Sequence, residues 1–340
     1  YAPSPTGFQH IGGVFAALIN ERLASQSEGV FYVRVEDTDQ TRLVDGAIEN
    51  MLNGMAWAGV NHTEGVVLGE NGEVTQVGPY GPYIQSERLD IYKEHIQTLL
   101  DSGKAYYCFC SKERLDEVRE KQMAEKVLPG YHGEYATCRN LSTEEAIAKI
   151  ENGESYIVRL KSPGNIENRV EFKDLIKGDL SLPENNIDIV IIKSDGLPTY
   201  HFAHAVDDHL MGTTHVIRGE EWLPSLAKHI QLFSYLGFKL PKYMHIAQIM
   251  RIDENGNKKK LSKRDMGANM DDYTSMGYCP DAVCEYVMTL LNSNYEEWHM
   301  QNPTKAYTDF PFNIKKMSAS GCLFDLNKLG DISKNVLSRW

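Results

Sequence analysis

Two short segments, far apart in the chain, carry residues suited to phosphate chemistry. The first, HIGG at residues 10–13, comes just before residues 14–27, whose apolar spacing predicts a helix. A helix start offers N–H donors and a positive dipole end, and glycine lets a nucleotide approach the backbone closely. The second, KLSKR at residues 260–264, places two ammonium groups on a polar loop, where they suit the charge of a leaving pyrophosphate. Together the segments predict a nucleotide site.

Five further polar motifs accompany these segments along the chain. They are APSPTG at 2–7, RVEDTD at 34–39, GLPTYH at 196–201, VDD at 206–208 and VIRGEE at 216–221. HIGG alone is uninformative, because many loops enter helices this way. In this order, however, the motifs resemble the catalytic portion of a bacterial-type glutamyl-tRNA synthetase, a class I aminoacyl-tRNA synthetase. The resemblance covers nearly the whole chain, and it equates the first and last segments with the HIGH and KMSKS motifs of that class.

The resemblance implies ATP-dependent ligation of L-glutamate to tRNA(Glu) through a glutamyl-adenylate. The glutamate carboxylate would attack the α-phosphate of ATP, pyrophosphate would leave, and the terminal hydroxyl of tRNA would take the acyl group. No protein nucleophile is needed, so catalysis consists of alignment and neutralisation of phosphate charge. Mg²⁺ is implied as the partner of ATP. Members of this family need tRNA before they activate glutamate, and we expect the same coupling here.

The resemblance also assigns residues to the ATP side of the site. It gives the catalytic role to His10, Gly12, Lys260 and Lys263. It places six residues beside ATP: His10, Gly12, Glu221, Trp222, Ser262 and Lys263. The alternative interpretation is structural, with the first two residues shaping a turn, Glu221 and Trp222 starting a helix, and Ser262 ordering its loop.

A second group is assigned to the amino-acid substrate. The predicted glutamate pocket comprises Ser4, Glu36, Tyr200, His204 and Arg218. Arg218 ends a predicted buried strand, where a charge is costly unless it is paired, and an anionic substrate would pair it. The alternatives are a surface ion pair of Glu36 with Arg34 and a core role for Tyr200. Family members carry one more arginine directly before the position of Tyr1, so we expect the pocket to need a residue upstream of this chain.

Three cysteines predict a structural zinc site. Cys108, Cys110 and Cys138 lie in a charged segment, and C-x-C followed by a later cysteine is typical of metal ligands. Relatives bind zinc here through a later Tyr-x3-Cys, whereas this chain has Glu134 in place of that tyrosine. Tyr131, Tyr135 and His132 compete for the fourth position, and His132 is the best ligand chemically. Three free buried thiols are the alternative. The remaining cysteines are predicted to be core residues: Cys279, Cys284 and Cys322.

The elements around these residues predict an α/β fold. Strand-like and helix-like patterns alternate, with strands expected at 30–35, 187–192, 214–218 and 243–250 and helices at 44–58, 89–102, 113–125, 200–211, 222–235 and 279–291. This layout predicts a doubly wound parallel-sheet (Rossmann-like) catalytic domain, split by an α+β insertion and followed by a mainly helical segment. Ligands of such sheets bind at the carboxyl ends of strands, where Ser4, Glu36 and Arg218 are expected.

Four parts follow from this layout. Residues 1–100 and 187–250 are the expected halves of the catalytic domain, and 101–186 is the expected tRNA acceptor-binding insertion with the zinc site. Residues 251–340 hold the KMSKS-like loop and a helical stem-contact segment. Tyr1 is not a start methionine, and the family continues into a helical anticodon-binding part. We therefore expect a catalytic fragment that lacks that part.

Composition limits the partners and the compartment. The 340 residues carry a formal net charge of −12 with a sequence pI near 5.4, which argues against a non-specific polyanion binder such as a DNA-coating protein. A local basic face can still bind tRNA. No apolar run approaches the roughly 18 residues of a membrane span. Six cysteines without disulfide-like spacing indicate a reduced, cytoplasmic setting.

Three other functions are alternatives to the ligation of glutamate to tRNA(Glu). One is a glutamyl-queuosine tRNA(Asp) synthetase-like enzyme, which glutamylates a modified base on tRNA and shares the early motifs. The segment 324–329 (FDLNKL) resembles full-length synthetases more closely. A glutaminyl enzyme has a different opening motif. A non-catalytic tRNA-binding paralogue would not need His10, Lys260 and Lys263, which are all present.

Overall fold

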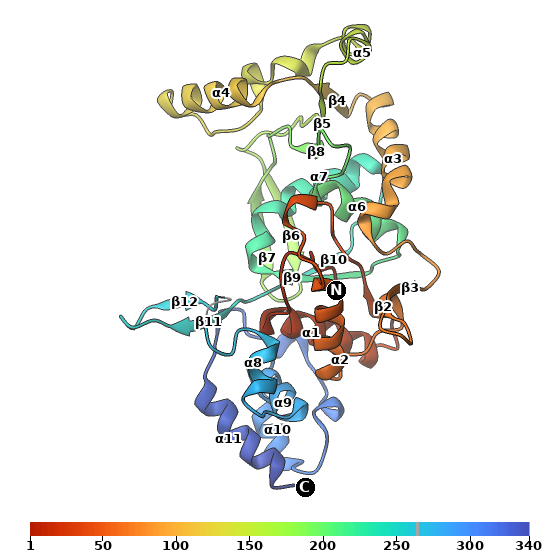
Figure 1. The fold of residues 1–340 in the computed structure, drawn as a ribbon. Coiled ribbons are helices and arrows are strands. Elements are labelled where there is room, and N and C mark those ends of the chain that lie inside the picture. Colours follow the sequence, from red (N-terminus) through yellow and green to blue (C-terminus); the bar gives the residue numbers. More distant parts are fainter. Residues whose placement is uncertain (263–264, 340) are drawn as a thin grey trace.

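A computed structural model describes residues 1–262 and 265–339 of the chain, in which helices and strands alternate as expected (Figure 1). The helices are α1 (Ile11–Gln26), α2 (Ala47–Trp57), α3 (Leu89–Asp101), α4 (Lys112–Ala124), α5 (Thr143–Glu151), α6 (Tyr200–Leu210), α7 (Leu226–Leu236), α8 (Met270–Ser275), α9 (Pro280–Leu291), α10 (Tyr295–Gln301) and α11 (Leu326–Leu337). None of the helices in the described part of the chain is long and apolar enough to cross a membrane.

The strands are short and fall into five separate ladders. They are β1 (Tyr32–Val33), β2 (Glu64–Leu68), β3 (Val74–Val77), β4 (Ala105–Cys108), β5 (Ile157–Leu160), β6 (Arg169–Asp174), β7 (Gly178–Pro183), β8 (Val190–Ile192), β9 (His215–Gly219), β10 (Lys242–Ile246), β11 (Ile249–Ile252), β12 (Lys258–Lys260) and β13 (Cys322–Leu323). In Figure 1 the helices α4 and α5 lie at one end of the molecule, the central strands in the middle, and α8 to α11 at the other end.

Local sequence explains the expected helices. The side chain of His10 accepts a hydrogen bond from the Gly12 amide at the start of α1, and Ser142 forms a capping box with Glu145 at the start of α5. The helix predicted over 222–235 differs at its start. It opens as a 3₁₀ turn, η5 (Glu220–Ser225), which contains Pro224, and α7 follows at Leu226. Proline has no amide N–H, so it does not continue an α-helical ladder.

The prediction of one doubly wound parallel sheet is confirmed only as a mixed α/β fold. Parallel pairing is present between β1 and β2 and between β9 and β10. These pairs belong to different ladders, and β8, expected in the parallel sheet, pairs antiparallel with β5. Because β4, β5 and β8 form one antiparallel ladder, a strand from the expected insertion joins a strand from the expected second half.

Extended segments outside the ladders complete the centre of the molecule. The Arg34 amide donates to Tyr1 O at 3.0 Å, and the Glu36 amide donates to Pro3 O at 2.9 Å. On the other side of this segment, the Val35 amide donates to Tyr83 O at 2.8 Å. Residues 1–3, 34–36 and 83–85 therefore run side by side, and the first and second of these segments lead into the candidate site.

Two apolar cores support these elements. The larger core joins α1, α2 and β1 to the late helix α9, for example through Leu18, Val33 and Val287. The smaller core joins α3, α6, α7 and β8. Of the three cysteines predicted to be core residues, Cys284 is buried, whereas Cys279 and Cys322 are only partly buried. Helices late in the chain thus hold α1 in place, and α1 carries the first motif.

Candidate active site

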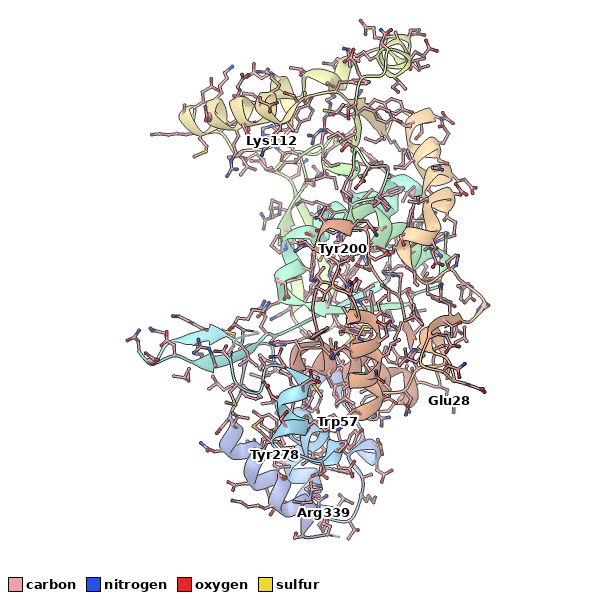
Figure 2. The ribbon with its side chains drawn as sticks, in the orientation of Figure 1. Glu28, Trp57, Lys112, Tyr200, Tyr278 and Arg339 are labelled. Carbon is pink, nitrogen blue, oxygen red and sulfur yellow. The ribbon has the colours of Figure 1, made fainter. Side chains whose placement is uncertain are left out.

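One cavity brings together most of the residues chosen from the sequence. It has a volume of about 1350 Å³ and lies at the middle of the molecule, where Figure 2 labels Tyr200. Ten of the predicted residues line it: Ser4, His10, Gly12, Glu36, Tyr200, His204, Arg218, Glu221, Trp222 and Lys260. Ser262 does not line it, and Lys263 and Arg264 lie outside the described residues. The expected role of Lys263 therefore stays a prediction.

The start of α1 is joined to the segment that follows the lysine loop. The Ile11 amide donates to Ala268 O at 2.8 Å, and the Met270 amide donates to Gln9 O at 3.1 Å. The amide of Gly12 donates to His10 Nδ1 at 2.9 Å. These amides therefore have partners within the chain, unlike the free donors expected from the sequence. The positive end of the helix dipole still faces the cavity.

A hairpin of β11 and β12 carries Lys260 to the cavity. Lys260 Nζ lies 3.6 Å from Glu221 Oε1, and Gln248 Nε2 donates to the other oxygen of Glu221 at 3.0 Å. More than half of the Lys260 side chain is exposed, so this ion pair is weak and its ammonium group is available to an anion.

Ser262 orders the loop that follows Lys260. Its amide and its hydroxyl both donate to Asp265 Oδ2, at 2.7 and 2.9 Å, and Arg251 Nε lies 2.9 Å from the same oxygen. Two hydrogen bonds and one ion-pair contact on the same carboxylate oxygen fix the closure of the loop. The structural alternative for Ser262 thus has direct support.

Arg218 is held rigidly at the opposite side of the cavity. Its Nε donates to His245 Nε2 at 3.0 Å, and its Nη1 lies 2.9 Å from His229 Nδ1 and 3.3 Å from the Tyr200 hydroxyl. The guanidinium carbon lies 4.7 Å from the centre of the Tyr243 ring. Arg218 Nη2 is buried and has no hydrogen-bond partner among the described residues. A buried cation that lines a cavity and keeps one nitrogen without a partner among the described residues suits an anionic group.

Tyr200, His204 and Trp222 form an aromatic wall beside Arg218. The rings of Tyr200 and Trp222 lie 4.3 Å apart, and the ring of His204 stacks on Tyr200 at 5.6 Å. His204 Nδ1 lies 2.9 Å from Asp208 Oδ2, and its Nε2 lies 2.8 Å from the Tyr243 hydroxyl. Both ring nitrogens of His204 are therefore engaged within the protein, and its contribution is to support Tyr200.

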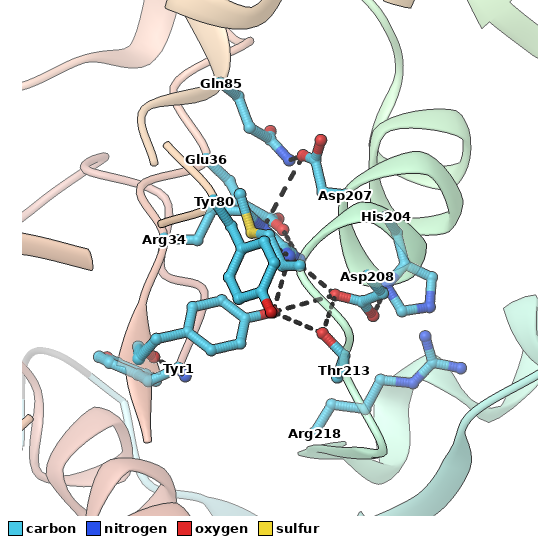
Figure 3. Close-up of polar contacts among 12 residues, drawn as sticks. Tyr1, Arg34, Glu36, Tyr80, Gln85, His204, Asp207, Asp208, Thr213 and Arg218 are labelled. Atoms are coloured by element: carbon cyan, nitrogen blue, oxygen red, sulfur yellow. Dashed lines mark hydrogen bonds and ion pairs between the residues drawn. The ribbon is translucent and has the colours of Figure 1, made fainter. Parts of the chain in front are cut away.

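Glu36 belongs to a buried charge network centred on Arg34 (Figure 3). Arg34 Nη2 donates to Glu36 Oε1 at 3.1 Å, and Arg34 Nη1 donates to Asp208 Oδ1 at 2.7 Å. The ion pair of Glu36 with Arg34 considered from the sequence is thus present, but it is buried rather than exposed. Burial raises the pKa of Glu36 to about 7, although Arg34 acts in the opposite direction.

The network continues to Asp207 and Asp208, which belong to the VDD motif at 206–208 but were not predicted as site residues. Asp207 is completely buried and accepts hydrogen bonds from Arg88 Nε at 2.7 Å, Gln85 Nε2 at 2.9 Å and the Tyr92 hydroxyl at 2.7 Å. Although burial opposes it, the charge of Arg34 holds the pKa of Asp208 below its ordinary range. Two adjacent aspartates inside an apolar helical pattern were the available signal, because buried carboxylates need partners.

Histidines around Arg218 were also missed. His229 lies in α7 and His245 lies in β10, and both are completely buried. Burial lowers the pKa of both imidazoles, and the nearby Arg218 guanidinium adds to this effect. The signal in the sequence was a histidine inside the apolar strand pattern at 243–250, which calls for a buried partner.

The three predicted metal-ligating cysteines meet at a separate place, beside α4. The sulfur atoms of Cys108, Cys110 and Cys138 all lie within 4.8 Å of one another. The Tyr131 hydroxyl lies 3.2 Å from Cys110 Sγ and accepts a hydrogen bond from the Cys138 amide at 3.1 Å. His132 is not brought into this group, because its Nε2 lies 2.9 Å from Leu128 O. The donor set fits a soft, tetrahedral metal ion such as zinc.

Fold and cavity together define a class of protein. A mixed α/β catalytic domain places a helix start, a lysine-bearing hairpin and a buried arginine around one cavity large enough for a nucleotide and a small acid. A helix start and an exposed ammonium group suit phosphate, and a buried guanidinium suits a carboxylate.

Comparison with known proteins agrees with this class. The sequence model described as tRNA synthetases class I (E and Q), catalytic domain, matches residues 1–330. The chain is 60% identical over 339 residues to a protein named glutamate–tRNA ligase from Clostridium beijerinckii, covering 99% of this chain and 60% of that protein. A glutamate–tRNA ligase from Clostridium perfringens is 56% identical over 340 residues, covering 100% of this chain and 61% of the relative.

A solved structure supports the same relationship. The crystal structure of a glutamate tRNA ligase from Elizabethkingia meningosepticum, in complex with its amino acid, matches with a TM-score of 0.87 at 32% identity. The match covers 100% of this chain and 69% of that chain. The chain therefore belongs to the class I tRNA synthetases for glutamate and glutamine, and it spans about 60% of the length of the curated relatives it matches.

Proposed function

We propose that this chain forms the catalytic part of an enzyme that ligates L-glutamate to tRNA(Glu) with ATP. One observation carries the proposal. The cavity that holds the start of α1 and Lys260 also holds Arg218, whose Nη2 has no partner among the described residues. A phosphate-binding end and an acid-binding end thus face each other. The chemistry of such a site is alignment of a carboxylate with the α-phosphate of ATP.

On the ATP side, the helix start with His10 and Gly12 receives the nucleotide. Lys260, and Lys263 according to the resemblance, neutralise the leaving pyrophosphate. Glu221 and Trp222 lie between this end and the amino-acid pocket, since both line the cavity beside Tyr200. ATP would bring Mg²⁺, which bridges phosphate oxygens and reduces their charge.

On the amino-acid side, Arg218 binds a carboxylate of glutamate, and Glu36 binds the amino group. Tyr200 offers its hydroxyl beside Arg218, while Ser4 lines the cavity and His204 supports the Tyr200 ring. A neutral glutamine amide in this pocket would leave the cation unpaired, so the site favours glutamate.

The proposal extends to the surrounding parts. The parallel ladders β1–β2 and β9–β10 represent the two halves of a Rossmann-like nucleotide-binding fold, and residues 101–186 form the subdomain that receives the tRNA acceptor end. The enzyme acts in the cytoplasm, where its tRNA and ATP are present.

The test is glutamate-dependent exchange of pyrophosphate into ATP, with and without tRNA(Glu). We expect exchange that requires tRNA, followed by formation of glutamyl-tRNA. Exchange without any tRNA, with transfer to tRNA(Asp), would indicate the glutamyl-queuosine type of enzyme. Binding of tRNA without exchange would indicate a non-catalytic paralogue.

A first prediction concerns pH. The ammonium group of glutamate needs an ionised Glu36, and the pKa of Glu36 is raised to about 7. Glu36 is therefore half ionised near this pH, becomes fully ionised at higher pH and loses its charge as the pH falls. We expect calorimetry to show that the affinity for L-glutamate decreases about tenfold for each pH unit below 7. Glu36→Gln should bind glutamate weakly and with a flat profile between pH 6 and 8, and a wild-type affinity that does not change over this range would contradict the assignment.

We further propose that Cys108, Cys110 and Cys138 bind one structural zinc ion. The Tyr131 hydroxyl is the closest additional oxygen donor described beside these thiols, so we assign it the fourth position ahead of His132. Thiolate is the form of cysteine that binds metal. Zinc would supply fixed geometry to a small cluster whose buried apolar residues are Cys108, Tyr131, Ala136 and Cys138.

Metal analysis of protein purified without chelator checks this second prediction. We expect about one zinc ion per chain in the wild type and very little in Cys110→Ala. Cys279→Ala, which changes a cysteine outside the cluster, is the matched control and should keep its zinc. Tyr131→Phe should bind zinc more weakly, whereas His132→Ala should not. Wild-type protein without zinc would show that the thiols are structural.

A further inference from the structure

A chain of buried hydrogen bonds leads away from Arg218 to a carboxylate outside the cavity. Arg218 and His245 are register partners in the parallel ladder of β9 and β10, and Arg218 Nε donates to His245 Nε2 at 3.0 Å. The other ring nitrogen, His245 Nδ1, lies 2.7 Å from Asp174 Oδ2. All three side chains are buried, so water does not compete for these bonds.

The direction of the first bond fixes the tautomer of His245. An arginine Nε–H can only donate, so His245 Nε2 must be the unprotonated acceptor. The proton of the neutral ring therefore lies on Nδ1, and it is donated to Asp174. Which ring nitrogen carries the proton is thus set by the partner of the other nitrogen.

Asp174 is itself held by the turn between β6 and β7. Its Oδ1 accepts from the Ile176 amide at 2.9 Å and from the Lys177 amide at 2.8 Å, while the backbone amide of His245 lies 3.2 Å from its Oδ2. Although burial opposes it, the hydrogen bond from His245 keeps the pKa of Asp174 below its ordinary range. The carboxylate is therefore a fixed acceptor aimed at His245.

A second series of hydrogen bonds from Arg218 does not end at a carboxylate in the described part of the chain. Arg218 Nη1 contacts His229 Nδ1, and His229 Nε2 lies 2.9 Å from His201 Nδ1. His201 is only partly buried, and no carboxylate ends this chain in the contacts of the described residues. The chain through His245 is the one that is fixed at its far end by a charge.

We propose that Asp174 and His245 are positioning residues for Arg218. Asp174 keeps His245 in the Nδ1–H tautomer, and His245 Nε2 then holds Arg218 Nε. The guanidinium is thereby kept in the orientation that leaves Nη2 as the donor to the glutamate carboxylate. Neither residue touches substrate. The inference rests on the proposed function. It adds that a carboxylate of the β6–β7 hairpin, Asp174, determines the geometry of the glutamate pocket.

Asp174→Asn tests this role with a nearly isosteric change. The two turn amides hold the amide oxygen of the new side chain at the Oδ1 position, so its NH₂ group points at His245 Nδ1. His245 must then accept on Nδ1 and carry its proton on Nε2. Two N–H donors, His245 Nε2 and Arg218 Nε, would then face each other, and their hydrogen bond would be lost. We expect the KM for glutamate to rise about 10- to 100-fold in tRNA-dependent pyrophosphate exchange, with the KM for ATP unchanged.

Three further measurements separate positioning from a general structural role. Nitrogen NMR of histidine-labelled protein should show His245 protonated at Nδ1 in the wild type and at Nε2 in Asp174→Asn. This measurement does not depend on enzymatic activity. Asp179→Asn, an exposed carboxylate on the same hairpin, should behave as wild type in both assays. His245→Gln keeps one donor and one acceptor and should retain most of the glutamate affinity, whereas His245→Leu should lose it.

The outcomes are distinct. A wild-type chain that shows the Nδ1–H tautomer but no glutamate-dependent exchange would contradict the proposed function alone. An active wild type in which Asp174→Asn changes the tautomer without raising the KM for glutamate would overturn the positioning role. If Asp174→Asn does not fold, the two His245 variants decide the question. Equal KM values for glutamate in His245→Gln and His245→Leu would then overturn the positioning role.

Discussion

Replacing Arg218 by alanine is expected to abolish most of the affinity for glutamate. The guanidinium is buried at the cavity and held by two histidines and Tyr200, and its Nη2 has no partner among the described residues. Removing one partner of a buried charge pair costs about 2–5 kcal/mol, because the remaining charge is left unpaired. This range corresponds to a roughly 30- to 5000-fold rise in the KM for glutamate.

The measurement is tRNA-dependent pyrophosphate exchange at varied glutamate and varied ATP. The KM for ATP should change little, because the polar contacts of Arg218 within the described chain are with His245, His229 and Tyr200 and not with the helix start or Lys260. Arg218→Lys should lose most of the affinity too, since a single ammonium group cannot reproduce the bonds to His245 and His229 together with the substrate contact.

Arg169→Ala is the matched control. Arg169 lies on the exposed edge of β6 and bonds to Ser181, far from the cavity lining, so its variant should keep the wild-type KM for glutamate. An unchanged KM in Arg218→Ala would place the carboxylate site elsewhere, provided that circular dichroism shows both variants folded.

Arg34→Met is expected to produce the largest loss of stability. Arg34 is buried and pairs with Glu36 at 3.1 Å and Asp208 at 2.7 Å, and its Nε lies 3.8 Å from Asp207. Methionine fills much of the space but leaves these carboxylates without their shared cation. Breaking a buried ion pair in this way costs about 3–5 kcal/mol of unfolding free energy.

Urea unfolding followed by circular dichroism gives this change in free energy. Arg42→Met is the control, because Arg42 also pairs with an aspartate, Asp39 at 2.6 Å, but on the surface. Its loss should shift the urea midpoint far less. Similar shifts in the two variants would show that the Arg34 network contributes little to the stability of the fold.

The sequence alone determined the features that depend on neighbouring residues. The helix over 14–27 is observed as α1, and the helices over 113–125, 200–211 and 279–291 are observed as α4, α6 and α9 within one residue at each end. Apolar periodicity and capping residues act within a few positions, so they can be read locally. The resemblance likewise named ten residues that line one cavity, and eight of them lie in the ordered motifs, which are dispersed along the chain.

The tertiary structure alone decided how those residues are paired. It placed β8 against β5, buried the ion pair of Glu36 and Arg34, and left one nitrogen of Arg218 without a partner among the described residues. It also joined Asp174 to His245, which are 71 positions apart. The chemical type of a side chain determines which hydrogen bonds and ion pairs it can form. Which of them it does form depends on its burial and on the direction from which its partners approach. Both are determined only when distant elements pack together.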